Sequence, residues 1–177
     1  MVLWITGLSG SGKTTLCQAL YGLLKPRAPE VVLLDGDIIR SALGGGLGYT
    51  EADRQVQVKR MQGLAKALAS QDLIVLVAVL YAHPELLAWN RRNLPGYFEI
   101  YIRVSMETVL ARDAKGWYAK AVRGEVSDVV GIDIPWHAPG SSDLVLDGDH
   151  PEEPNVLAQR VALAVPRLAA LLEKARR

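Results

Sequence analysis

The chain has 177 residues, of which 50% are hydrophobic and 22% are charged, and its 20 basic and 19 acidic residues leave a formal net charge of +1. This length and composition are typical of one folded domain, residues 1–177, and exclude a disordered chain. The balanced charge predicts no nucleic-acid partner, and the single cysteine excludes an internal disulfide and a cysteine zinc cluster. No apolar run reaches the ~18–20 residues of a membrane span, and the opening lacks the basic region of a signal peptide. We therefore expect a cytoplasmic protein with no membrane partner.

Five short apolar runs, rich in bulky or β-branched residues, are predicted to be β-strands: residues 2–6, 31–35, 73–79, 98–104 and 143–147. Because these runs are continuous rather than alternating, they suit strands buried on both faces of a parallel sheet. Helical patterns lie between them, including residues 14–25, a helix that Thr50 caps, and residues 154–177 with a break near Pro166. This alternation predicts an α/β fold with a doubly wound, mostly parallel five-stranded sheet and helices on both faces.

One long segment, residues 112–142, breaks the alternation because it is charged, contains glycines and prolines, and lacks a clean period. A long irregular stretch inside a compact domain is usually functional, often an active-site lid. A disordered surface insertion is the alternative, but Trp117, Tyr118 and Trp136 are too apolar to lie in water without a use. We therefore expect a lid at about residues 112–142.

Residues 7–14, GLSGSGKT, match the phosphate-loop pattern G-x-x-x-x-G-K-[ST] without a mismatch. The backbone N–H groups of such a loop curl around a phosphate, which requires conformations that glycine adopts at low cost. Lys13 supplies a positive charge to the β- and γ-phosphates, and the Thr14 hydroxyl ligates Mg²⁺. Because the pattern follows a predicted strand and opens a predicted helix, whose N-terminus attracts anions, it predicts a P-loop nucleotide site.

Two acidic residues, Asp35 and Asp37, follow the second predicted strand and flank Gly36. The carboxyl ends of the strands in an open α/β sheet face the ligand crevice, so a metal ion and an acceptor hydroxyl would meet here. The alternative is that Asp37 only caps a helix over residues 38–42, but capping explains neither Asp35 nor the glycine. A GTPase would need an Asn-Lys-x-Asp base-reading stretch, which the sequence lacks.

With these residues in place, the sequence resembles the adenylylsulfate (APS) kinases, which transfer the γ-phosphate of ATP to the 3′-hydroxyl of adenosine 5′-phosphosulfate. Several blocks keep their order and spacing over most of the chain: residues 7–15, 34–40, 47–54, 112–125 and 131–139. Blocks in register are far more specific than one phosphate loop. The resemblance implies a single P-loop kinase domain and a phosphotransferase activity with an alcohol as acceptor.

The resemblance also implies which residues bind ATP, Mg²⁺ and a small-molecule nucleotide acceptor. The implied catalytic residues are Lys13, Asp35 and Asp37, with Asp37 as the candidate base. An aspartate is a weak base for an alcohol, but positioning and charge neutralisation dominate the loose transition state of phosphoryl transfer. The donor is expected to contact Gly7, Ser9, Gly10, Ser11, Gly12, Lys13, Thr14, Thr15 and Arg112, with Thr14 as the metal ligand. The acceptor is expected to contact Arg40, Tyr49, Arg54, Gln57, Lys115, Val129 and Ile132. Related kinases are commonly dimers, so we expect a homodimer.

The departures from the family pattern fall in the acceptor half. The family clamps the acceptor adenine between two phenylalanines, whereas this chain has Tyr49 and Val129 at those positions. Family asparagines and a serine are replaced by Ile38, Gln57 and Tyr81. By contrast, residues 83–102 and 129–135 resemble a subgroup found with surface-polysaccharide genes, in which a cytidine diphosphoramidate kinase activity is known.

Three functions therefore remain open from the sequence. The first is an APS kinase with a looser acceptor pocket. The second is a kinase for another activated nucleotide, such as cytidine diphosphoramidate in surface-polysaccharide modification. The third is a nucleotide-binding regulator without catalysis, against which the retention of Lys13, Thr14, Asp35 and Asp37 argues.

Overall fold

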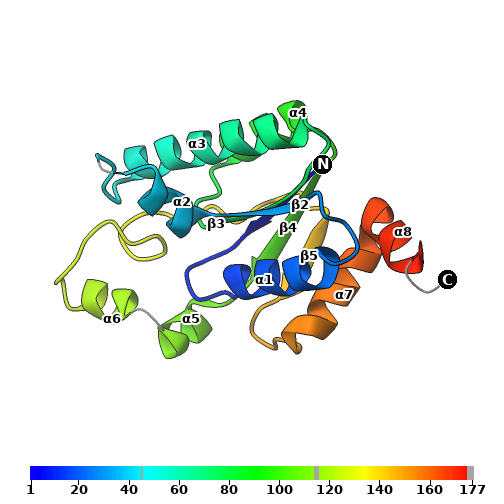
Figure 1. Ribbon diagram of the computed structural model, residues 1–177. Coiled ribbons are helices and arrows are strands. Elements are labelled where there is room, and N and C mark those ends of the chain that lie inside the picture. The colour runs from blue at the N-terminus through cyan, green and yellow to red at the C-terminus, as the bar shows by residue number, and fades with distance from the viewer. Residues whose placement is uncertain (45, 114–115, 175–177) are drawn as a thin grey trace.

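The computed structural model describes residues 1–44, 46–113 and 116–174, and these form a five-stranded sheet between two layers of helices (Figure 1). Every strand pairing is parallel, and the strand order is β2-β3-β1-β4-β5. The strands are β1 (Val2–Thr6), β2 (Val31–Asp35), β3 (Ile74–Val79), β4 (Tyr97–Arg103) and β5 (Leu144–Asp147). The five strands predicted from the apolar runs are confirmed, with ends that differ by one residue at most.

The continuous apolar runs reflect burial of the strands on both faces of the sheet, as the sequence predicted. Every residue of β1 and of β3 is buried, since both strands lie inside the sheet with helices over both faces. In register, Thr6 of β1 lies beside Val79 of β3, and Asp35 of β2 lies beside Ala78. The carboxyl ends of β1, β2 and β3 therefore meet at one edge of the sheet, where a ligand crevice is expected.

Two helical layers cover the sheet (Figure 1). One face is covered by α3 (Glu51–Ala69) and α4 (Pro84–Asn93), and the other by α1 (Lys13–Leu24), α7 (Pro154–Ala164) and α8 (Pro166–Lys174). The short helices are α2 (Gly36–Ala42), α5 (Met106–Arg112) and α6 (Trp117–Val122). Each layer has its own core, with Met61 of α3 in one and Leu20 of α1 in the other, both at 0% exposure.

The expected helix cap at Thr50 and the expected break near Pro166 are confirmed, and Ser105 caps a further helix. The Thr50 hydroxyl accepts a hydrogen bond from the Asp53 N–H at 3.2 Å and caps α3. The Ser105 hydroxyl does the same for Thr108 and α5 at 3.2 Å. The C-terminal pattern breaks as expected, because α7 ends at Ala164 and α8 begins at Pro166.

None of the helices in the described ranges could cross a membrane by itself. The segments Pro154–Ala164 and Pro166–Glu173 have the combined length and composition for it, but they are bent by 111° at their junction. Ala158, Val161 and Ala162 of α7 are fully buried in the core against α1 and the sheet. Packing thus accounts for this buried face of α7, whereas Val156 and Leu163 on the same helix are exposed.

The core under α1 gives a direct test of the fold. Leu20→Ala is expected to lower the free energy of unfolding by about 2–5 kcal/mol, because it removes buried methyl groups and leaves a cavity. Urea denaturation measures this change. Gln18→Ala, at an exposed position of the same helix, should change the free energy by less than about 0.5 kcal/mol. Equal effects from the two substitutions would contradict the burial of this face of α1.

Candidate active site

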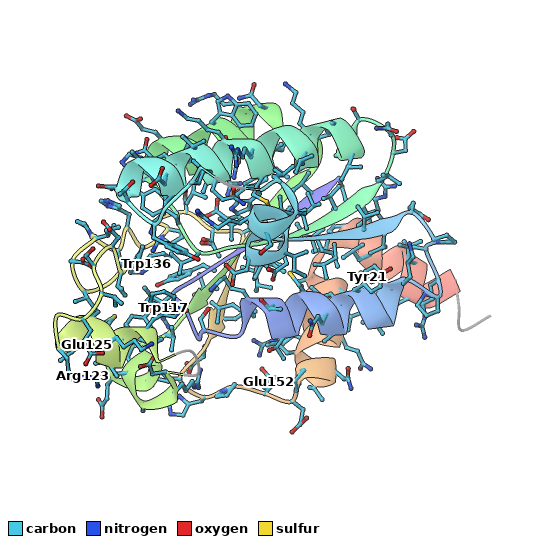
Figure 2. All side chains as sticks on the ribbon, turned by 60° about the vertical axis from the view of Figure 1, so that its left-hand side comes forward. Tyr21, Trp117, Arg123, Glu125, Trp136 and Glu152 are labelled. Carbon is cyan, nitrogen blue, oxygen red and sulfur yellow. The ribbon has the colours of Figure 1, made fainter. Side chains whose placement is uncertain are left out.

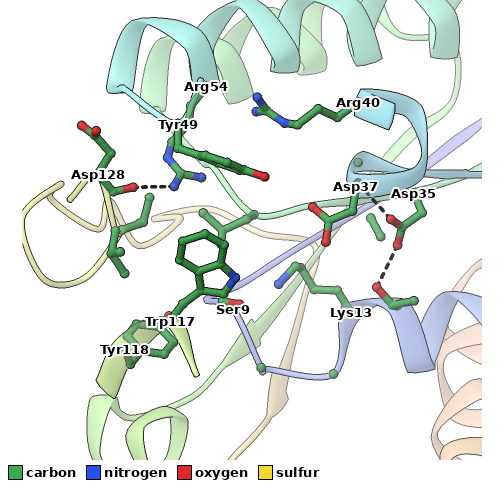
Figure 3. Close-up of a pocket in the computed structure, with 18 of the residues that line it drawn as sticks. Ser9, Lys13, Asp35, Asp37, Arg40, Tyr49, Arg54, Trp117, Tyr118 and Asp128 are labelled. Carbon is green, nitrogen blue, oxygen red and sulfur yellow. Dashed lines mark hydrogen bonds between the residues drawn. The ribbon is translucent and has the colours of Figure 1, made fainter. Parts of the chain in front are cut away.

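A cavity of about 580 Å³ opens at the carboxyl edge of the sheet (Figure 3). Its walls come from the phosphate loop after β1, the β2–α2 turn, the start of α3 and the lid segment. The predicted site residues that line it are Ser9, Gly10, Gly12, Lys13, Thr14, Thr15, Asp35, Asp37, Arg40, Tyr49, Arg54 and Val129. The structure thus brings the predicted donor and acceptor halves of the site to one cavity.

The phosphate loop has the backbone that the motif predicts. Gly10 and Gly12 have φ angles of 76° and 98°, a region that favours glycine. The Lys13 ammonium donates to the Leu8 carbonyl at 2.6 Å, which holds the side chain over the loop. Since α1 begins at Lys13, the first N–H groups of the helix point toward the cavity, as an anion site requires.

Two predicted loop residues lie behind the cavity wall. Ser11 is buried, and its hydroxyl lies 3.5 Å from the Lys13 ammonium. A Cβ at Gly7 would lie 2.7 Å from the Ile102 carbonyl oxygen and 2.7 Å from the Ser11 hydroxyl. Gly7 therefore allows the loop to pass close to β4, and its role in the structure is packing.

The Asp35 carboxylate joins the two halves of the site. Its Oδ2 accepts a hydrogen bond from the Thr14 hydroxyl at 2.8 Å, and its Oδ1 accepts from the N–H groups of Asp37 and Ile38 at 3.0 and 3.3 Å. Asp35 is therefore the cap of α2, and the alternative that Asp37 caps this helix is wrong. The reason is that α2 begins at Gly36, two residues before the expected start, so Asp37 lies in its first turn.

Asp37 is exposed, and its carboxylate points into the cavity toward the side of Lys13 (Figure 3). The turn that presents it is packed tightly, because a Cβ at Gly36 would lie 3.1 Å from the Ala78 carbonyl oxygen of β3. On the other side, the Gln57 amide of α3 donates to the Gly36 carbonyl at 3.2 Å. Gln57 was predicted to bind the acceptor, and the structure places it as a buried support of the β2–α2 turn.

Gln57 also lines a smaller cavity of about 70 Å³ that adjoins the main one. Asp37, Arg40 and Arg54 border both cavities, and Tyr81 closes the smaller one. The Tyr81 hydroxyl donates a hydrogen bond to the Glu51 carboxylate. Burial and this hydrogen bond raise the pKa of Tyr81 to about 12, so Tyr81 stays a neutral donor at physiological pH.

Two guanidinium groups flank the ring of Tyr49 on the acceptor side. The guanidinium carbon of Arg40 lies 5.0 Å from the ring centre, and that of Arg54 lies 5.6 Å from it. Arg40 also donates to the Gly48 carbonyl at 2.6 Å, and Arg54 to the Asp128 carbonyl at 2.6 Å. Burial and the charge of Arg40 lower the pKa of Arg54, but a guanidinium remains protonated in proteins. Two fixed positive charges thus face the acceptor half of the cavity.

Three predicted contacts lie elsewhere or cannot be placed. Arg112 donates to the Gly148 carbonyl at 2.8 Å and does not line the cavity. Ile132 is 41% exposed and also lies outside the lining. Lys115 falls outside the residues that the structure describes, so its predicted contact with the acceptor stays a prediction.

The structure adds lining residues outside the predicted set of contacts, among them Ser41, Trp117, Tyr118, Ser127 and Asp128. Trp117 and Tyr118 stand out in the sequence as large aromatic residues in a polar, irregular segment. The sequence pattern does not show which residues they contact. Asp128 contributes its backbone carbonyl to Arg54, a role that any residue type could fill. Sequence spacing alone carries no information on such a contact.

The oxygen atoms around Thr14 fit a magnesium ion. Within the described ranges, no cluster of three or more His, Cys, Asp or Glu side chains could hold a metal. The Thr14 hydroxyl and the Asp35 carboxylate are, however, hard oxygen donors 2.8 Å apart beside the phosphate loop. Mg²⁺ in nucleotide sites takes few protein ligands of this kind and completes its shell with phosphates and water.

Comparison with known proteins identifies the family. Residues 1–147 match the profile of the adenylylsulphate kinase family. The chain belongs to this family. An adenylyl-sulfate kinase of Deinococcus deserti is 42% identical over 148 residues, which cover 84% of this chain and 82% of the relative. A cytidine diphosphoramidate kinase of Campylobacter jejuni is 38% identical over 168 residues, which cover 95% and 96%.

The likeness extends to the structure. The Mycobacterium tuberculosis APS kinase CysC, solved in complex with AMPPNP and APS, superposes with a TM-score of 0.82 at 33% identity and covers 97% of this chain and 96% of its own. The prediction of a P-loop kinase fold is thereby confirmed. This chain is a phosphotransferase of the APS kinase family that acts on a hydroxyl group.

The tight packing at Gly36 predicts a specific defect in this kinase. Gly36→Ala should displace the β2–α2 turn from the Ala78 carbonyl, which moves Asp37 by a few tenths of an ångström. We expect kcat to fall about tenfold or more, because small misplacements of catalytic groups are costly. Gly63→Ala on α3, where an added Cβ meets nothing within 4 Å, is the matched control and should leave kcat unchanged. Steady-state kinetics at saturating ATP measure both, and an active Gly36→Ala enzyme would contradict the role of this turn.

Proposed function

We propose that this kinase transfers the γ-phosphate of MgATP to the 3′-hydroxyl of adenosine 5′-phosphosulfate. The observation that carries the proposal is one cavity with a phosphate loop on one wall and Asp37, Arg40 and Arg54 on the other. The family match and the adenylyl-sulfate kinase of Deinococcus deserti support this reaction. A donor held by the phosphate loop and an acceptor held by the opposite wall would lie next to each other, so the γ-phosphoryl group would pass directly from ATP to the acceptor hydroxyl.

The donor half holds the triphosphate through backbone and side-chain groups of the phosphate loop. The N–H groups of the loop and of the first turn of α1 bind phosphate oxygens, and Lys13 neutralises charge on the γ-phosphate. Thr14 and Asp35 are the residues that would hold Mg²⁺, with Asp35 acting through water. When bound, the ion neutralises the charge that develops between the β- and γ-phosphates.

The acceptor half orients the alcohol. Asp37 accepts the proton of the 3′-hydroxyl and keeps its oxygen in line with the phosphorus atom. Arg40 and Arg54 hold the anionic 5′ end, because a planar guanidinium can donate two parallel hydrogen bonds to an oxyanion. The lid, with α6, covers the cavity and excludes water that would otherwise accept the phosphoryl group.

Two substitutions test these roles. Lys13→Ala should lower kcat at least a hundredfold and so abolish nearly all turnover, because it removes a charge that stabilises the transition state.

Asp37→Asn should lower kcat by about 10²- to 10⁴-fold and leave the Kd for MgATP within twofold, because Asp37 acts on the acceptor. Rapid-quench kinetics and calorimetric titration measure the two quantities. Glu107→Gln on α5, exposed and outside the cavity, is the control for exchanging a carboxylate for an amide. An equal loss of ATP affinity in Asp37→Asn would refute its role in alignment.

Cytidine diphosphoramidate is a second candidate acceptor. The Campylobacter jejuni cytidine diphosphoramidate kinase aligns over 95% of this chain, which supports this candidate. Val129 and Tyr81, where the APS kinase pattern has phenylalanine and serine, border the two cavities. A pocket altered at these positions can suit a smaller pyrimidine nucleotide.

A side-by-side assay decides between the acceptors. We expect a higher kcat/KM with adenosine 5′-phosphosulfate than with cytidine diphosphoramidate, each measured at saturating MgATP by coupled release of ADP. A higher value with cytidine diphosphoramidate would replace the first proposal with the second. Tight binding of ATP without transfer to either nucleotide would show a regulator that binds nucleotides without catalysis.

The homodimer that the family resemblance implies and the cytoplasmic location inferred from composition stay predictions. Both concern the protein in solution and in the cell. A small-molecule nucleotide is the partner that the family membership supports.

A further inference from the structure

Two exposed aromatic rings lie side by side, tilted to each other, at the acceptor end of the main cavity. The ring centres of Tyr49 and Trp117 lie 5.8 Å apart with an angle of 50° between the ring planes, and both residues line the cavity. Tyr49 is 47% exposed and Trp117 is 39% exposed. We propose that Trp117 is the second ring of the clamp that holds the acceptor base, in place of the ring missing at Val129. This inference rests on the proposed function, which supplies an acceptor with an aromatic base.

Val129 is poorly suited to that role. It is 8% exposed, and an aliphatic side chain offers no π-face on which a base can stack. Trp117 offers the largest flat surface of any side chain and loses little conformational entropy when it binds. The chain thus carries the stacking surface on α6 rather than on the loop that follows this helix.

The exposure of Trp117 distinguishes it from the packing aromatics. Its neighbour Tyr118 is 2% exposed and Trp4 is fully buried, as side chains that serve the core are. Trp117 instead lies on the side of α6 that faces the phosphate loop, whereas the ion-paired Arg123 and Glu125 lie on the outer side of the lid (Figure 2). An indole whose apolar surface lines a cavity, rather than packing in the core, is placed to bind a ligand.

The charges around the two rings fit a nucleotide. The guanidinium carbons of Arg40 and Arg54 lie 5.0 and 5.6 Å from the ring centre of Tyr49. A base beside this ring therefore has its 5′ phosphate group within reach of both arginines. The site combines a stacking surface and fixed positive charge, the two features by which proteins bind single nucleotides.

The spacing of the rings indicates how the clamp works. A base stacked on both sides needs ring centres about 7 Å apart, since each carbon contact takes about 3.5 Å. The observed 5.8 Å is about 1 Å short of this, so the rings must part and become more parallel when the base enters. Trp117 is the first residue of the six-residue helix α6 in the lid, so a small movement of the lid supplies the change. Entry of the base is thereby coupled to an outward movement of Trp117 and α6.

Binding measurements on substituted enzymes test the clamp. The probes are adenosine 5′-phosphate and cytidine 5′-diphosphate, titrated calorimetrically with the donor site filled by MgADP. Trp117→Leu should weaken the Kd of at least one probe about tenfold or more, and Trp117→Phe, which keeps a ring, should weaken it less than threefold. The Kd for MgADP should stay unchanged in both. Trp89→Leu on α4, a tryptophan outside both cavities, is the control and should change none of these values.

The outcomes separate the clamp from the proposed reaction. Adenosine 5′-phosphate affected more than cytidine 5′-diphosphate assigns an adenine acceptor, and the reverse assigns a cytosine acceptor; both support the clamp. The same loss of affinity in an enzyme that phosphorylates neither acceptor would retain the clamp and reject the proposed function. Unchanged Kd values in Trp117→Leu, or equal losses with leucine and phenylalanine together with weaker MgADP binding, would overturn the inference.

Discussion

The site depends on the hydrogen bonds of one buried carboxylate. Asp35 accepts from the Thr14 hydroxyl of α1 through one oxygen and from two N–H groups of α2 through the other. It therefore holds α1, which follows the phosphate loop, and α2, which presents Asp37, in a fixed relation. A charge-assisted bond in a partly buried position is stronger than its neutral counterpart, so the relation is stiff. One carboxylate thus fixes both the Thr14 hydroxyl beside the phosphate loop and the turn that presents Asp37.

The fold and the donor half could be predicted from the sequence because their physics is local. Continuous apolar runs become buried parallel strands, and the phosphate loop requires glycines where φ is positive, as Gly10 and Gly12 show. These constraints act within a few residues and leave a direct trace in the order of residue types. The end of α3 that carries Thr50 and the break at Pro166 belong to the same class of signal.

The acceptor half was predicted less completely because its contacts are tertiary. The role of Gln57 as a support of Gly36 depends on how α3 packs over the β2–α2 turn. The sequence offered only Asp37 as a possible cap of α2, because spacing alone does not show that the helix begins at Gly36 and is capped by Asp35. Trp117 was recognised as unusual, but its partner Tyr49 comes from a distant segment that only the folded chain brings near. Residues that act through a backbone carbonyl, such as Asp128, leave no trace in the sequence.

The hydrogen bond from the Arg54 guanidinium to the Asp128 carbonyl links recognition of charge to the shape of the site. Asp128 begins a turn that the Asp133 carboxylate closes by accepting from the N–H groups of Asp128 and Val129. A guanidinium carries five N–H donors, and this carbonyl takes a hydrogen bond from only one nitrogen of Arg54, so the same side chain can bind an oxyanion and keep the turn. The position of the turn and the direction of this guanidinium therefore depend on each other.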